Sequence, residues 1–361
     1  MKPISSAIPF DLPSRAKTLS VLETLAIGTA GGLLFVFAHF PGGLISGAML
    51  AVAIAAMAGR PLSVPPILTQ SVLVVLGISL GSVVSRQLIQ HVSAYPLTIA
   101  LLALATFCST FGSSYYLQRV HGWDRTSAFL AGSPGALSQI TILAVERGAD
   151  LPAIAVVQTL RVIALTAALP LLLALGGLAP ASAPAPTMTT ASPLELAELV
   201  AAALALAMLL RLAKFPASWM FGAMIASSLL HGMGLIEGGL PPWVRNVALV
   251  GIGALMGSRF ARMKIKTLAS HLNAAVGSFA IAIAISSVFV AAIVVTTNVH
   301  FADILVAFAP GAMDAMLALA LTLHIDPVFV GAHHLSRFVF VTIATPGIVH
   351  LFGRTQDDVD D

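Results

Sequence analysis

The sequence has very little charge: Asp, Glu, Lys and Arg make up 9% of its 361 residues, while 58% are hydrophobic. Soluble domains average about 25% charged residues and roughly 45–50% apolar residues. A soluble fold would have to bury about ten apolar runs of roughly 17 to 25 residues, and single cores stop growing near ~250–300 residues. The composition therefore excludes an ordinary soluble protein and predicts an all-α polytopic membrane protein.

The sequence is also poor in potential metal ligands, since it has a single cysteine, Cys108, which lies within an apolar run. One cysteine excludes both a disulfide framework and a cysteine-based metal site. His333 and His334 are adjacent, so they point to different faces of a helix, and the other histidines are scattered near loops. We therefore expect no metal, no cofactor and no enzymatic activity.

The formal net charge of +3 and the pI of about 9.3 would suggest a nucleic-acid partner in a soluble protein. Here Lys and Arg gather in short loops between apolar runs, where they set the orientation in a lipid bilayer. No basic patch remains, so we expect no nucleic-acid partner. Residues 1–18 contain basic residues without an adjacent cleavage site of small residues, which favours an uncleaved cytoplasmic lead.

What the sequence does have is a repeated polar interruption of its apolar runs. Gly-Ser-Pro-Gly-Ala-Leu-Ser-Gln occupies 132–139, and Ala-Pro-Gly-Ala-Met-Asp occupies 309–314. Placing Pro134 on Pro310 gives an offset of 176 residues. Without a gap, the same offset aligns Asp150 with Asp326, Gln158 with His334, Arg161 with Arg337, Gly77 with Gly253 and Gly81 with Gly257. Self-similarity at a fixed offset predicts an internal duplication.

The repeat sets the domain boundaries, and an uncharged stretch rich in Pro, Ala and Thr separates the two halves. The expected parts are a lead at 1–18, a first membrane repeat at 19–177, a linker at 178–193, a second membrane repeat at 194–353 and a tail at 354–361.

Each half offers six apolar segments, of which the fifth is interrupted. If all twelve cross the membrane, the Lys and Arg outside the spans divide 8 to 8 between the two sides. If the interrupted segments are re-entrant, the division is 14 to 2, with Arg86 and Arg245 outside, as the positive-inside rule requires. We predict two inverted repeats of five transmembrane helices, each with a re-entrant or broken segment. A broken helix that crosses stays open as an alternative, giving 10 to 12 membrane segments.

The interruptions are the first candidate site. Non-helical backbone at membrane depth is tolerated only inside protein or beside a water-filled cavity, and the helix that restarts after a break favours an anion. The candidate substrate-binding residues at the breaks are Ser133, Gly135, Ser138, Gln139, Gly311 and Asp314. The alternative is that Gly and Pro only kink packed helices.

Two arginines supply the other candidates. Arg161 and Arg337 lie near the middle of their spans, where Arg costs about 2.5–3.5 kcal/mol. Gln158 shares a helix face with the first, and His334 shares one with the second. Because Arg binds a carboxylate through two parallel hydrogen bonds, all four residues are expected to bind substrate.

Asp314 has two interpretations. As the acidic residue predicted deep in the second half, it can take up a coupling H⁺ or help to coordinate Na⁺. It can equally form a structural salt bridge with Arg337. That pair has no counterpart in the first half, because Ser138 occupies the matching place and leaves Arg161 without an acid.

The paired motifs resemble the bacterial AbrB family of duplicated membrane proteins. The likeness rests on a Pro-x-x-x-x-x-Gly-Ala-Met element at 41–49 and 216–224 and on the Pro-Gly-Ala elements that begin at Pro134 and Pro310. It implies a multi-pass protein of the bacterial inner membrane, and the 14 to 2 charge division puts both termini in the cytoplasm. Members are described as regulators of gene expression or as ammonia monooxygenases. Neither description follows from these residues, because no DNA-binding domain and no copper-ligand spacing is found.

More distantly, inverted five-helix repeats with re-entrant segments resemble the glutamate–sodium and citrate–sodium symporters. This resemblance implies a scaffold, a mobile core that carries both interrupted segments, and a homodimer, but it sets no substrate. We therefore expect a secondary transporter of a small organic anion, an amino acid or a carboxylate, coupled to H⁺ or Na⁺ and working by alternating access. The alternative is a membrane sensor or indirect regulator of gene expression that keeps the transporter fold without turnover.

Overall fold

The computed structural model describes residues 15–83, 95–134, 137–177, 189–263 and 265–352, and within these ranges it consists of helices joined by turns and loops, with an isolated bridge between Thr190 and Gly239. The first half contains α1 (Arg15–Phe37), α2 (Gly43–Met57), α3 (Pro66–Ser82), α4 (Tyr95–His121), α5 (Arg125–Gly132), α6 (Leu137–Glu146) and α7 (Leu151–Leu175). The second half contains α8 (Pro193–Leu212), α9 (Ser218–Gly232), α10 (Pro242–Ser258), η2 (Arg259–Arg262), α11 (Ile265–Thr296), α12 (Phe301–Phe308), α13 (Met313–Thr322) and α14 (Pro327–Phe352). The predicted all-α class is confirmed.

The helices of the two halves correspond in order and in length. Helices α2 and α9 each have 15 residues, and α3 and α10 each have 17. The short helices agree too, with eight residues in α5 and α12 and ten in α6 and α13. This is the order that the 176-residue offset predicts, although the duplication of the sequence itself stays a prediction.

Among the described residues, six helices are long and apolar enough to cross a membrane: α1, α4, α7, α8, α11 and α14. The longest, α11, has 32 residues and rises about 48 Å at 1.5 Å per residue, well beyond a hydrocarbon core of about 30 Å. Helices α2, α3 and α13 are apolar but shorter. The chain is therefore a polytopic membrane protein by these criteria, while the count of ten crossings stays a prediction.

Helices α1 to α3 and α8 to α10 form one packed group, in which each half contacts the other: α3 lies on α9, and α10 lies on α2. A Cβ atom on Gly77 would collide with the carbonyl oxygen of Met220, and one on Gly253 would collide with that of Ile45. Glycine thus lets each helix approach the backbone of the other half closely. We call this the scaffold group.

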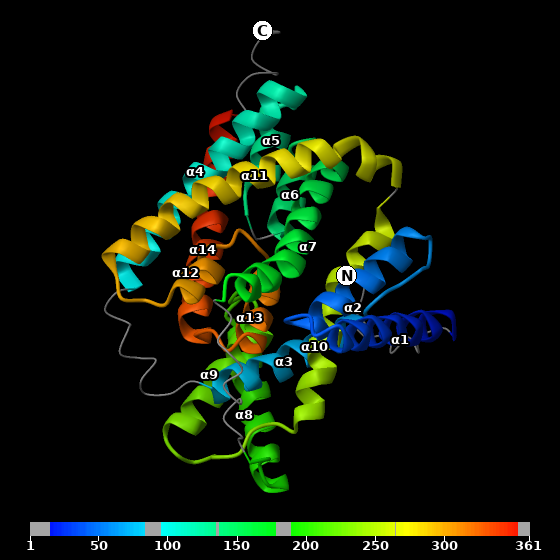
Figure 1. Ribbon diagram of the computed structural model, residues 1–361, viewed down its shortest axis with the longest axis vertical. Helices are drawn as coiled ribbons and strands as arrows, with labels where there is room; N and C mark the ends of the chain where they lie inside the picture. The colour runs from blue at the N-terminus through cyan, green and yellow to red at the C-terminus, as the bar shows by residue number, and fades with distance from the viewer. Residues whose placement is uncertain (1–14, 84–94, 135–136, 178–188, 264, 353–361) are drawn as a thin grey trace, which may run out of the picture.

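The remaining long helices and both interrupted segments form a second group, here called the core group, of α4 to α7 and α11 to α14. Helices α4 and α11 lie side by side (Figure 1), and Ser113 Oγ donates a hydrogen bond to the carbonyl of Ser278 at 2.9 Å. Contacts of α2 with α7, such as the 2.9 Å hydrogen bond from Ser46 Oγ to the carbonyl of Thr166, join the two groups.

The two ends of each interrupted segment lie close together in the fold. The N–H of Asp150, after α6, donates to Ser127 Oγ in the first turn of α5 at 2.8 Å. In the second half, the N–H of Asp326 donates to Asp303 Oδ1 at 2.9 Å, which joins the end of α13 to the start of α12. Helix α5, with eight residues, is about 12 Å long, and helix α6, with ten residues, is about 15 Å long. Each length is roughly half the thickness of a ~30 Å hydrocarbon core. The geometry favours re-entrant hairpins over a crossing helix.

Candidate functional site

The two helix breaks meet within the core group. Pro134 and Pro310 line the same narrow space, together with Arg337. Helices α4 and α11 contribute the other polar lining residues, which are Thr106, Ser109 and Ser286. The fold therefore brings the two interruptions together at the tips of the two hairpins.

At the first break, Arg161 and Gln158 of α7 bind the end of α5. The Arg161 guanidinium donates to the carbonyls of Ala131 at 3.1 Å and Gly132 at 3.3 Å. Gln158 Nε2 donates to the carbonyl of Leu130 at 2.9 Å. The last carbonyls of a helix have no partner within it and carry partial negative charge, so an amide and a cation suit this position.

The second break repeats this arrangement with residues of α14. Arg337 donates to the carbonyls of Ala307 at 2.9 Å and Ala309 at 2.6 Å. His334 Nε2 lies 3.1 Å from the carbonyl oxygen of Val306, and because a carbonyl only accepts, this nitrogen carries the proton. Four predicted site residues therefore share one observed role, which is to cap the helices that end at the breaks.

Both arginines are nearly inaccessible to solvent, with 2% of Arg161 and 4% of Arg337 exposed. Among the described residues, neither forms an ion pair with a carboxylate, and the Nε–H of each has no hydrogen-bond partner. Two uncompensated cations with a free donor each create an environment that favours an anion.

The other residues predicted at the breaks are only partly described. Ser133 follows α5 and donates through Oγ to the carbonyl of Phe129 at 3.0 Å. Gly311 donates its N–H to the carbonyl of Ala309 at 2.8 Å. Three predicted residues lie outside what the structure describes, namely Gly135 and the side chains of Ser138 and Gln139.

Asp314 lies in the first turn of α13, and among the described residues it forms no ion pair within 4 Å; Arg259 of η2 is the cation whose charge acts on it, from beyond salt-bridge distance. Arg337 has two backbone carbonyls as partners in place of the aspartate that the structural alternative assigned to it. Burial lowers the pKa of Arg259, and the Asp314 carboxylate opposes that lowering. The sequence analysis missed Arg259 because it counted this residue only as a loop charge that sets orientation.

The sequence analysis also missed a row of buried hydroxyls on α4, which it treated as a plain apolar span. The row consists of Thr98, Thr106, Ser109, Thr110 and Ser113. Thr98 Oγ1 lies 2.8 Å from His333 Nε2. The four-residue spacings from Thr106 to Thr110 and from Ser109 to Ser113 were a readable signal, since residues four apart lie on the same face of a helix.

Comparison with known proteins places this arrangement in a family. The profile of the family described as "Transition state regulatory protein AbrB" matches residues 44–353, which include both breaks and all four capping residues. The chain belongs to the AbrB family. It is 26% identical over 305 residues to the protein YhjN of Bacillus subtilis (strain 168), covering 78% of this chain and 79% of that protein. It is 23% identical over 317 residues to the "Putative regulator AbrB" of Escherichia coli (strain K12), covering 87% of this chain and 91% of that protein. No solved structure matches this AbrB-family chain.

Proposed function

We propose that this AbrB-family protein is a secondary transporter of a small organic anion, an amino acid or a carboxylate. The observation that carries the proposal is the meeting of two helix breaks beside Arg161 and Arg337, two buried cations without an acidic partner among the described residues. The helix dipoles place a partial charge of about −0.5 at the end of α5 and about +0.5 at the start of α6, and these two partial charges offset each other. The positive charge of the arginines is therefore the net charge at the break. A bound carboxylate would supply the counter-charge that both arginines lack among the described residues.

The fold supports alternating access as the mechanism. Both breaks belong to the core group, and the scaffold group is built from interlocked helices of the two halves. In transporters with inverted repeats, one such group moves against the other around a site near the membrane midplane. We assign Asp314 to the coupling of H⁺ or Na⁺, because it is the carboxylate in the first turn of α13, the helix that begins directly after the second break.

Uptake into proteoliposomes tests the proposal. A thermal-shift screen of carboxylates and amino acids, with and without Na⁺, selects the substrate, whose uptake is then measured under Na⁺ and pH gradients. Arg161→Gln and Arg337→Gln should lose uptake, and Arg245→Gln, at the far end of α10, is the matched control that should keep it. Uptake that persists in both Arg161→Gln and Arg337→Gln would contradict the proposal.

A second candidate is a membrane sensor or indirect regulator of gene expression without turnover. The family description and the name of the Escherichia coli relative favour it. Binding of an anion without any uptake in proteoliposomes would select this candidate. In either case we propose a homodimer in the bacterial inner membrane, with both termini in the cytoplasm, no enzymatic activity and no nucleic-acid partner.

A further inference from the structure

A large cavity lies where the core group meets the scaffold group. Its volume is about 730 Å³, within the range of about 300–1,000 Å³ for pockets that hold small ligands. Its walls come from α6, α7, the loop between α2 and α3, the end of α10, η2 and the start of α11. It is thus bounded by both groups of helices.

The lining is mostly apolar and carries one charge. Leu255 and Met263 are among the aliphatic lining residues, and Thr159 and Ser258 are among the hydroxyls. Of the described residues that line the cavity, Arg259 is the charged one, and it is only partly buried. A ligand that matches these walls has one anionic group and an apolar body.

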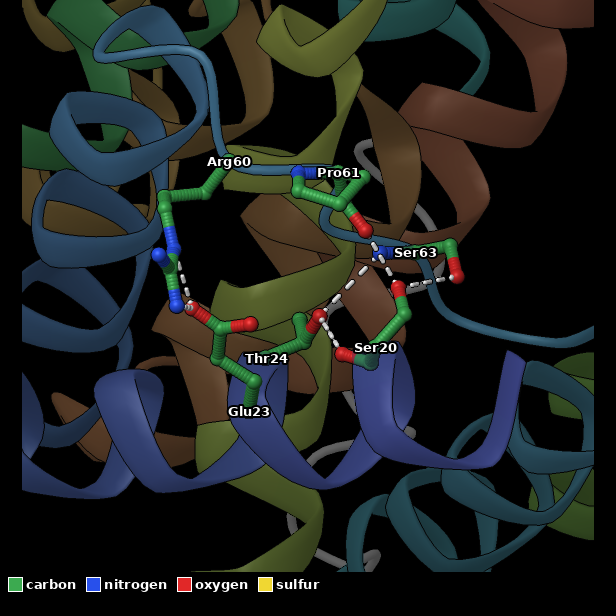
Figure 2. Close-up of polar contacts among 6 residues, drawn as sticks. All are labelled: Ser20, Glu23, Thr24, Arg60, Pro61 and Ser63. Atoms are coloured by element: carbon green, nitrogen blue, oxygen red, sulfur yellow. Dashed lines mark hydrogen bonds and ion pairs between the residues drawn. The ribbon is translucent and has the colours of Figure 1, made fainter. Parts of the chain in front are cut away.

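One wall of the cavity is held in place by the polar cluster in Figure 2. Arg60 Nε donates to Glu23 at 2.5 Å, and the N–H of Ser63 donates to Thr24 Oγ1 at 3.1 Å. These contacts tie α1 to the loop that includes Ser63 and lines the cavity. Glu23 and Arg60 also form an ion pair, which links α1 to the start of this loop.

The equivalent place in the other half is filled with side chains. Ala155 lines the cavity, whereas its counterpart Gly331 is buried, and a Cβ atom there would meet Leu317 at 3.4 Å and Met224 at 3.7 Å. Leu317 occupies the place that Thr141 has in the first half, 176 residues earlier. An opening in one half and close packing in the other is the asymmetry expected of one state in an alternating-access cycle.

We propose that this cavity binds a monocarboxylate with an aliphatic or aromatic body and admits it to the site at the breaks. The inference rests on the proposed function and narrows its substrate class. The carboxylate binds Arg259 in competition with Asp314, and the apolar body lies against Leu255 and Met263. A dicarboxylate would leave its second charge against an apolar wall, which is costly without a partner.

Binding of phenylacetate to the full-length protein in lipid nanodiscs, measured by calorimetry, tests this proposal. Acetate lacks the apolar body and phenylacetamide lacks the charge, so both should bind at least tenfold more weakly than phenylacetate. Arg259→Gln should weaken phenylacetate binding at least tenfold and leave phenylacetamide unchanged. Asp314→Asn should strengthen phenylacetate binding severalfold, because the competing carboxylate is gone. Ala155→Leu should weaken the binding of both phenylacetate and phenylacetamide, because the larger side chain fills part of the cavity.

Arg245→Gln removes an arginine of α10, the helix before η2, that does not line the cavity, and it should leave phenylacetate affinity unchanged. Size-exclusion profiles and Tm values confirm that each variant is folded. Equal binding of phenylacetate and phenylacetamide, unchanged binding in Arg259→Gln, or no phenylacetate binding to the parent protein would overturn the inference. If the protein takes up other anions but does not bind phenylacetate, the proposed ligand class is wrong and the proposed transport function stands. If it binds phenylacetate but takes up no anion, the proposed ligand of the cavity stands and the transport function is wrong.

Discussion

Arg161 and Arg337 donate hydrogen bonds to equivalent carbonyls of two different helices, Ala131 at the end of α5 and Ala307 at the end of α12. The two acceptors lie 176 residues apart, as do the two donors. Each arginine therefore has a structural contact in addition to the substrate contact that we propose. A variant of either residue has to be judged on both stability and binding.

Arg161→Gln and Arg337→Gln should change stability little and abolish binding. Loss of the guanidinium leaves buried carbonyls unsatisfied, at about 1–3 kcal/mol each. It also removes a buried cation that costs about 2.5–3.5 kcal/mol in a span, so the two effects largely offset each other. The Tm should fall by only a few degrees, while the ligand-induced thermal shift disappears.

The lysine versions of these variants separate charge from geometry. Arg161→Lys and Arg337→Lys keep the cation but cannot reproduce two donors in a planar fork, so uptake should recover poorly. Gln158→Ala is the matched control, since it removes a cap of the same helix without a change of charge. Full uptake by either lysine variant would show that charge alone is sufficient at that position.

The electrostatic attraction between Asp314 and Arg259, which lie beyond salt-bridge distance, predicts a specific rescue. Asp314→Asn should leave Arg259 without its carboxylate, and Arg259→Gln should leave Asp314 without its cation, so each single variant should lower the Tm. The double variant should recover most of that loss, because neither charge is then stranded. Asp314→Asn combined with Arg337→Gln should show no such recovery. If that second pair recovers and the first does not, Arg337 is the true partner of Asp314.

Close packing within the scaffold group predicts opposite results for two kinds of glycine. Gly77→Ala and Gly253→Ala should each destabilise by about 1–3 kcal/mol, since the new Cβ collides with backbone of the partner helix. Gly232→Ala, where the added Cβ meets nothing within 4 Å, should stabilise α9 by about 0.5–1 kcal/mol. Thermal unfolding in detergent measures all three. Equal tolerance at the three positions would contradict the packing of α3 on α9 and α10 on α2.

The sequence revealed the breaks and the buried arginines because charge, Pro and Gly stand out in apolar runs. It could not show what the arginines bind, since a carbonyl at a helix end is a product of tertiary structure. Arg259 escaped notice for a related reason: only the fold brings a loop cation to the start of α13. The choice between re-entrant and crossing segments also stayed open until the contact between Asp150 and Ser127 showed that α5 and α6 form a hairpin.

The last prediction concerns sidedness, which the re-entrant hairpins and the 14 to 2 division of Lys and Arg jointly imply. Single cysteines are introduced on a Cys108→Ala background at Thr190, beside the linker, and at Lys266, in the first turn of α11. Both positions are exposed, and the bridge of Thr190 to Gly239 uses only backbone groups, so neither change should disturb the fold. In whole cells, an impermeant thiol reagent should label the cysteine at 190 and spare the one at 266 until the membrane is permeabilised. The reverse pattern would mean that the linker is cytoplasmic, and the inverted arrangement of five crossing helices per half would then be wrong.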